Sequence, residues 1–162
     1  MVKILFVCLG NICRSPAAEG VMKHLLRRYD LEKKVYCESA GTSAYHCGEL
    51  PDSRMRGHAL RRGLTLDSLA RQFEKDDFQK FDYIVTMDRS NYKNVMSLDP
   101  SHEFAEKVIP MAHLCHKMSI TEVPDPYSGG PEGFEEVLDI VEDGCRGLLD
   151  KLGLVNYDDS EK

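Results

Sequence analysis

The sequence predicts an α/β fold, a three-layer sandwich with a four-stranded parallel sheet flanked by helices on both faces. Short apolar segments alternate along the chain with longer segments whose apolar residues recur at helical spacing, a pattern typical of a parallel sheet covered by helices. The first apolar segment, Val2 to Val7, is almost continuously hydrophobic, as expected for a strand buried on both faces. With 162 residues the chain fits a single domain, which we expect over residues 1–153, followed by a polar tail over 154–162.

The remaining elements follow in order along the chain. Ser15 and Pro16 have the residue types of a helix N-cap and a first helical position, and the helix they open extends to about Tyr29. Three further strands are expected, over residues 35–40, 83–87 and 108–111. Further helices are expected over residues 52–62, from the third strand to about residue 98, and most clearly over 134–152. Ligands in such sheets bind beyond the carboxyl ends of the strands, and Cys8 lies at such an end.

The composition limits the classes of function. The chain carries 21 basic and 27 acidic residues, a net charge of −6, which argues against a non-specific nucleic-acid binder. No apolar run approaches the roughly 18–20 residues that cross a membrane, and the segment before Cys8 is too short for a secretory signal. We therefore expect a cytoplasmic protein, with no nucleic-acid or membrane partner, whose six cysteines are free thiols.

The segment from Cys8 to Ser15, between the first strand and the first helix, carries the strongest chemical signal. Five residues separate Cys8 from Arg14, about enough for the backbone to curl into an anion-binding cup at a helix N-terminus. Gly10 and Asn11 are residue types that tolerate the positive φ of a tight cup. Arg14 can bind two oxygens of a tetrahedral oxyanion, and the amides, the arginine and the helix dipole stabilise a thiolate at Cys8. Ser15 can cap the helix and also donate a hydrogen bond to that sulfur. The candidate phosphate-binding residues are Leu9, Gly10, Asn11, Ile12, Cys13, Arg14 and Ser15.

A second candidate group is Asp125, which lies between two prolines and ahead of a glycine-rich turn. The prolines restrict the backbone and can hold the carboxyl at a fixed reach. Such a carboxyl can donate a proton to a leaving oxygen, and general acid catalysis contributes typically ~10²–10⁴-fold. By itself the pattern also fits an aspartate that caps the amides of a turn.

The string from Val7 to Pro16, VCLGNICRSP, resembles the signature of the low-molecular-weight protein tyrosine phosphatases. Three later segments fall where that family has similar ones: Ser39–Thr42, Asp82–Asp88 and Asp125–Tyr127. The resemblance implies a flavodoxin-like fold of the phosphotyrosine phosphatase I type. It also implies a monomer without a cofactor that acts on phosphotyrosine in proteins and binds inorganic phosphate or other tetrahedral oxyanions.

The mechanism implied by the resemblance is a double displacement. Cys8 is the nucleophile and forms a phosphocysteine, while Arg14 and the loop amides hold the three equatorial oxygens. Asp125 protonates the leaving oxygen and then acts as base on the water that hydrolyses the intermediate. No metal is required, because Arg14 and the amides replace it.

The resemblance also assigns supporting roles. Tyr45 and Tyr127 are expected at the rim, where their rings would contact the phenyl ring of the substrate. Cys13 is expected to protect Cys8 by forming a disulfide with it on oxidation. Some family members have a second tyrosine where this chain has Ser128, so one rim contact differs. The residues expected to brace the loop by hydrogen bonds are Asn11, Ser15, Ser39 and Ser68.

Three alternative functions are open. An arsenate reductase of this fold needs relay cysteines around residues 80–90, and the chain has none between Cys47 and Cys115. A phosphate-binding module without turnover would not need Asp125. An arginine phosphatase would resemble a branch with threonine in place of Ile12, and the apolar Ile12 favours phosphotyrosine.

Three weaker patterns have simpler interpretations. His113 to His116 contain metal-ligand residue types, but no second motif accompanies them, so we predict no metal site. The arginines of residues 54–62 are expected on a solvated helix face. The charges from Glu122 to Asp143 are all negative and are expected on the outer face of the last helix.

Overall fold

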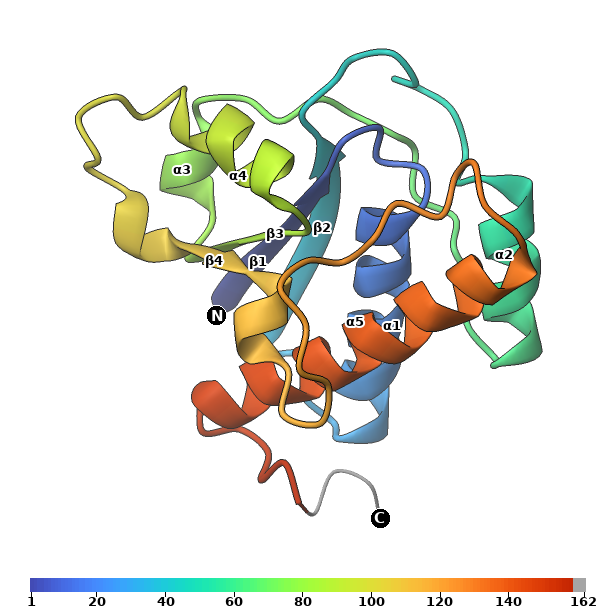
Figure 1. The fold of residues 1–162 in the computed structure, drawn as a ribbon. Helices are drawn as coiled ribbons and strands as arrows, with labels where there is room; N and C mark the ends of the chain where they lie inside the picture. Colours follow the sequence, from blue (N-terminus) through green and yellow to red (C-terminus); the bar gives the residue numbers. More distant parts are fainter. Residues whose placement is uncertain (159–162) are drawn as a thin grey trace.

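The computed structural model describes residues 1–158, which form a parallel four-stranded sheet with helices on both faces (Figure 1). The strands are β1 (Val2–Cys8), β2 (Val35–Gly41), β3 (Tyr83–Thr86) and β4 (Val108–Pro110). Their order is β2-β1-β3-β4, and each neighbouring pair is parallel. The connections therefore change direction at β1, so that the carboxyl end of β1 lies at the topological switch point.

The alternation of side chains along β1 explains why both faces are covered. Ile4 and Phe6 point into a core that includes residues of α1 (Arg14–Arg28) and α5 (Pro131–Lys151). Leu5 and Val7 point into a second, smaller core that includes Phe78 and Val95. These two residues lie on α3 (Asp77–Lys80) and α4 (Arg89–Met96). Figure 1 shows α1 and α5 on one side of the sheet and α3 and α4 toward the other, which confirms the predicted sandwich.

Several element boundaries differ from the prediction. The fourth strand ends at Pro110, because Met111 begins a short 3₁₀ helix, η2 (Met111–Leu114). A second 3₁₀ helix, η1 (Ala105–Lys107), precedes that strand. The last helix begins at Pro131, three residues before the apolar stripe, because proline suits a first helical position. Helix α3 has four residues and is too short to show helical periodicity in the sequence.

Helix α2 (Ser53–Arg61) packs against α5 through charged groups. Arg62 contacts Glu135 at 2.8 Å and Asp139 at 2.9 Å, and His58 contacts Glu135 at 2.5 Å. Arg54 lies over the rings of Tyr127 and Phe134, at 5.3 and 4.9 Å from their centroids. The prediction of a solvated basic face is confirmed for Arg54, Arg56 and Arg61, which are exposed. It is wrong for Arg62, which is half-buried against the acidic residues of α5.

The chain after α5 folds back onto that helix within the described residues. Tyr157 is buried, and its hydroxyl donates a hydrogen bond to Asp143, which also accepts from the amides of His116 and Met118. Burial raises the pKa of Asp143, but these hydrogen bonds outweigh it and hold the pKa below its ordinary value. Of the predicted tail, residues 159–162 lie outside the described residues. None of the described helices has an apolar stretch of the length that crossing a membrane requires.

Candidate active site

The loop between β1 and α1 is shaped by two residues that the sequence singled out for their backbone freedom. Asn11 has a φ of 57°, in the left-handed region that asparagine tolerates. Gly10 does not have a positive φ, so that expectation is wrong. Gly10 provides space instead, since a Cβ on it would lie 3.0 Å from the ring of His46. Gly41 at the end of β2 has a similar function, because a Cβ there would lie 2.7 Å from the carbonyl oxygen of Leu9.

Hydrogen bonds of Asn11 and Ser15 brace the loop from behind. The Asn11 side chain donates to Ser15 Oγ at 2.8 Å and accepts from the amide of Arg71 at 3.0 Å. Ser15 Oγ lies 3.0 Å from Cys8 Sγ and 3.3 Å from the carbonyl oxygen of Ala40. Cys8 is 2 % exposed, so this hydroxyl is one of the few polar groups that reach its sulfur.

The prediction that Ser15 is the N-cap of α1 is wrong. The N-cap is Cys13, which makes no side-chain capping bond, and Ser15 lies within the first turn. The amides of residues 10–13 donate no hydrogen bond to the other described residues, while the carbonyl oxygens of Ile12 and Cys13 accept. Because residues 11–13 are buried, these amides need an acceptor, and a helix N-terminus favours an anion.

Ser39 and Ser68 do not contact the loop as expected. Ser39 Oγ donates to the buried Glu19 at 2.6 Å, and Glu19 also pairs with Lys23 at 2.6 Å. The bond from Ser39 to Glu19 therefore ties β2 to α1. The side chain of Ser68 makes no hydrogen bond within residues 1–158, and the nearby backbone of Arg71 binds Asn11 instead.

Arg14 is buried, and its contacts bring Asp88 into the site. Arg14 Nη1 donates to Asp88 Oδ2 at 2.6 Å and to the carbonyl oxygen of Val123 at 3.1 Å. Burial lowers the pKa of Arg14, but Cys8, Asp88 and Asp125 together raise it above its ordinary value. Asp88 was missed in the sequence analysis. It is separated from the end of β3 by Met87 alone, which places it near β1 at the carboxyl edge of the sheet, and it also caps α4.

The sequence pattern around Asp125 fits both a proton donor and an aspartate that caps a turn, and the geometry of the side chain is compatible with both. Its Oδ1 accepts from the amide of Tyr127 at 3.1 Å, as an aspartate that caps a turn does. Its Oδ2 lies 3.7 Å from Arg14 Nη2, and its side chain is 46 % exposed. The carboxyl is therefore held in place by the turn and still faces the open side of Arg14.

A cavity of about 330 Å³ opens over Cys8, a size that suits a small ligand. Tyr45 is 84 % exposed and Tyr127 is 50 % exposed, and both line the cavity. His46 lies next to both rings, with its centroid 4.7 Å from that of Tyr45 and 6.4 Å from that of Tyr127. A single histidine in a loop gives no sequence pattern, so His46 was missed. The cavity is lined by Cys8, Leu9, Gly10, Ile12, Cys13, Arg14, Ser43, Tyr45, His46, Asp125 and Tyr127.

Cys13 lines the same cavity as Cys8. Burial, Asp52 and Cys8 raise the pKa of the Cys13 thiol well above its ordinary value, so this thiol is protonated at neutral pH. All six cysteines are free thiols in the structure. Within residues 1–158, no three His, Cys, Asp or Glu side chains are grouped as a metal site would require.

The fold and the loop together define a class of α/β protein with Cys8 and Arg14 facing one pocket at the switch point. Comparison with known proteins identifies the family within that class. The family model described as low molecular weight phosphotyrosine protein phosphatase matches residues 3–156. The chain therefore belongs to this family, and it is an enzyme of the low-molecular-weight protein-tyrosine-phosphatase class, a hydrolase.

Individual relatives cover nearly the whole chain. A Synechocystis protein named as a low molecular weight protein-tyrosine-phosphatase is 49 % identical over 156 residues, which are 95 % of this chain and 99 % of that protein. The chicken low molecular weight phosphotyrosine protein phosphatase is 38 % identical over 91 % of this chain and 94 % of its own. A crystal structure of an Entamoeba histolytica protein tyrosine phosphatase has a TM-score of 0.91 at 48 % identity, covering 94 % of this chain and 97 % of that one.

The left-handed backbone at Asn11 leads to a prediction for stability. Asn11→Ala and Asn11→Gly remove the same side-chain hydrogen bonds, but only alanine is strained at positive φ, by about 1–2 kcal/mol. The glycine variant avoids this strain, but it loses part of the gain in stability because glycine makes the unfolded chain more flexible. We expect the free energy of unfolding, measured with urea, to be about 0.5–1 kcal/mol lower for the alanine variant than for the glycine variant.

The matched control is Asn94, which is exposed on the regular helix α4. There the order should reverse, because glycine is less stable than alanine within a helix by about 1 kcal/mol. An alanine variant at position 11 as stable as its glycine counterpart, or more so, would contradict the role assigned to this backbone.

Proposed function

We propose that the protein hydrolyses phosphotyrosine in proteins, and small aryl phosphates, through a phosphocysteine intermediate on Cys8. The observation that supports this most strongly is that the amides of residues 10–13, in the loop after Cys8 and next to Arg14, donate no hydrogen bond within residues 1–158. Together they form a binding site for the three equatorial oxygens of a phosphoryl group, with the sulfur on the axis of attack.

Each step of the proposed reaction uses a group of the pocket. Cys8 Sγ attacks phosphorus, the S–P bond forms and the P–O bond to the tyrosine breaks. The proton of the Asp125 carboxyl goes to the tyrosine oxygen, which leaves as a phenol. A water then attacks phosphorus and gives its proton to Asp125. The S–P bond breaks, and inorganic phosphate and the Cys8 thiolate are released.

Arg14 is already oriented for this reaction. Asp88 and Val123 hold one of its terminal nitrogens, and Asp125 lies near the other. A guanidinium fixed in this way does not have to reorganise as charge moves onto the phosphoryl oxygens, which is how preorganised electrostatic stabilisation lowers a barrier. Asp88 acts on the substrate only through Arg14 and is therefore a positioning residue.

The aromatic side chains at the entrance of the catalytic pocket favour a substrate that carries an aromatic ring. Tyr45, His46 and Tyr127 surround the entrance to the cavity, and aromatic rings pack favourably on one another. Ile12 adds an apolar wall, which suits a phenyl ring better than a guanidinium. Relatives also support oxyanion binding: crystal structures of the Entamoeba histolytica enzyme are described with Hepes in the active site and as a product-state mimic.

The arsenate reductase alternative has no support in the structure. Cys115 is the next cysteine after Cys47, and its sulfur donates to the carbonyl oxygens of Met111 and Ile140 at 3.6 Å. Burial raises the pKa of Cys115 to about 12, so this thiol is not a reactive partner for Cys8.

The proposal includes the cellular setting and the response to oxidation. Free thiols fit a reducing compartment, so we place the enzyme in the cytoplasm. We take a monomer as the active unit, since one chain supplies every group that the proposed reaction uses. A peroxide oxidises Cys8 to a sulfenic acid and releases water. The thiol of Cys13 then condenses with it, which forms the Cys8–Cys13 disulfide and releases a second water.

A panel of phosphopeptides tests the substrate class. We expect wild-type enzyme to release phosphate from phosphotyrosine peptides, and to act at least 100-fold less efficiently on matched phosphoserine and phosphoarginine peptides, whose phosphoryl groups do not carry a phenyl ring into the rim. Phosphate release is measured with chelator present. Cys8→Ser should be inactive while it still binds vanadate, since Arg14 and the amides remain. Equal activity on all three peptides would contradict the proposal.

The proton transfer from Asp125 leads to a prediction about leaving groups. Asp125→Asn should lower kcat for alkyl phosphates more than for p-nitrophenyl phosphate, because p-nitrophenolate leaves without a proton. General acid catalysis is worth about 10²–10⁴-fold, so a loss of this size is expected for the alkyl ester. Asp76→Asn is the matched control, since Asp76 is exposed and makes no capping bond at α3. An equal loss of kcat on both esters would contradict the role of Asp125 as a general acid.

A further inference from the structure

A second cavity, of about 340 Å³, adjoins the catalytic pocket. It shares Leu9 and Ser43 with that pocket, so the two cavities meet at these residues. We call this second cavity the side groove. Its other residues come from segments that are far apart in the sequence, and they are Thr42, Gln72, Phe73, Asn94, Ser97 and Leu98.

The side groove is fixed relative to Cys8 by hydrogen bonds. The amides of Thr42 and Ser43 donate to the carbonyl oxygens of Cys8 and Leu9, both at 2.9 Å. Gln72 Nε2 donates to the Thr42 carbonyl oxygen at 3.2 Å. The wall of the groove and the phosphate-binding loop are therefore one rigid unit, and a ligand in the groove has a defined position relative to the reacting sulfur.

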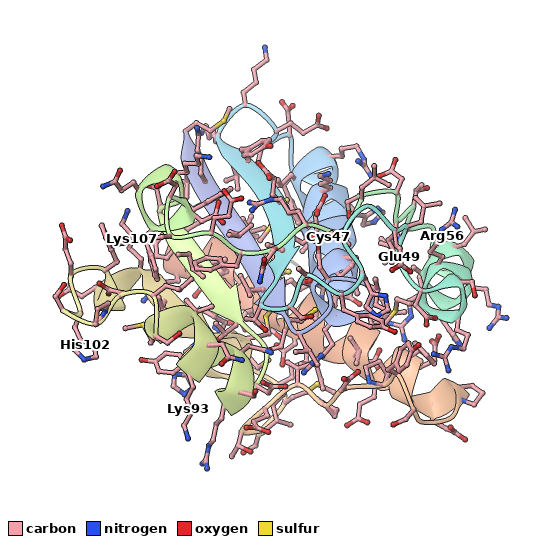
Figure 2. All side chains as sticks on the ribbon, turned by 90° about the horizontal axis from the view of Figure 1, so that it is seen from above. Cys47, Glu49, Arg56, Lys93, His102 and Lys107 are labelled. Carbon is pink, nitrogen blue, oxygen red and sulfur yellow. The ribbon has the colours of Figure 1, made fainter. Side chains whose placement is uncertain are left out.

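The side groove is lined without any ionisable side chain. It combines apolar groups, such as Leu9 and Leu98, with neutral amides and hydroxyls. The charged Lys93 of α4 extends outward from the molecule in Figure 2 and does not line the groove.

The opposite side of the catalytic pocket is charged. His46 pairs with Glu49 at 2.9 Å, and Arg54 pairs with Asp52 at 2.9 Å. Figure 2 shows Glu49 and Arg56 on the α2 side of this face and Lys93 on the α4 side. The lining of the side groove thus lacks the ionisable side chains found on the α2 side of the pocket.

We propose that the side groove binds the residue next to phosphotyrosine in a protein substrate and selects an uncharged side chain there. This inference rests on the proposed function. A phosphotyrosine whose phosphate reaches Cys8 leaves its backbone at the mouth, where Leu9 and Ser43 separate the two cavities. The adjacent residue of an extended peptide is about 3.3 Å further along, within reach of the groove. A charged side chain would lose water there without gaining an opposite charge, which is unfavourable.

Matched phosphotyrosine peptides test the wild-type enzyme. One residue, directly before or directly after the phosphotyrosine, is varied among glutamine, glutamate, methionine and lysine. We expect kcat/KM to be about tenfold lower for glutamate than for glutamine, and for lysine than for methionine, at one of these two positions. Equal values at both positions would overturn the proposal.

A charge placed in the groove should change this selectivity. Asn94→Asp is nearly isosteric and introduces a negative charge at the exposed edge of the groove. We expect it to raise kcat/KM for the lysine peptide relative to the glutamate peptide about fivefold, in low salt, with a smaller effect in high salt. The activity on p-nitrophenyl phosphate, which does not extend into the groove, should stay within twofold of wild type.

The matched control is Asn156→Asp, an exposed asparagine in the segment after α5. In Figure 1 this segment lies at the end of the molecule away from the loop between β1 and α1. It adds the same charge and should leave the peptide ratio unchanged. Equal changes in the lysine-to-glutamate ratio of kcat/KM for the two variants, or no change for Asn94→Asp, would overturn the proposal that the groove binds the neighbouring residue. If wild-type enzyme hydrolyses p-nitrophenyl phosphate but no phosphotyrosine peptide, the proposed function fails, and the groove proposal fails with it.

Discussion

The buried charge of Arg14 is the constraint on which the rest of the site depends. A guanidinium removed from water requires compensation within the protein, and Asp88 supplies it at 2.6 Å, with a further bond to the Val123 carbonyl oxygen. These contacts join the loop after β1, the start of α4 and the segment that carries Asp125. The groups to which the proposed function assigns oxyanion binding, attack and proton transfer are therefore connected through the same ion pair.

The parallel sheet brings these segments to one edge. Because β1 lies between β2 and β3, the chain after β2 supplies Tyr45 and one wall of the side groove. The chain after β3 supplies Asp88 and the α4 side of that groove. The left-handed backbone at Asn11 turns the loop, and its side chain fixes that turn to Ser15 and to the amide of Arg71. The strained residue is thus stabilised by the hydrogen bonds that also orient the hydroxyl toward Cys8.

The sequence predicted those parts of the fold and site that depend on neighbouring residues. The string from Cys8 to Arg14 is contiguous, so its strand, loop and helix could be predicted together. Asp88 and His46 could not, because their roles arise only when segments far apart in the chain meet. Ser15 looked like a helix cap because its residue type fits that position, but the helix begins earlier, at Arg14, and Ser15 contacts Cys8 and Asn11 from within the first turn.

Trapping the intermediate tests the central claim most directly. Asp125→Ala enzyme, which lacks the base for the second step, is mixed with p-nitrophenyl phosphate, whose leaving group needs no proton in the first step. The mixture is quenched within milliseconds and digested for mass spectrometry under conditions that preserve thiophosphate esters. The account predicts one phosphoryl group, on Cys8, which is absent from a Cys8→Ser, Asp125→Ala double variant treated in the same way. A phosphoryl group on another side chain, or turnover by the double variant, would contradict it.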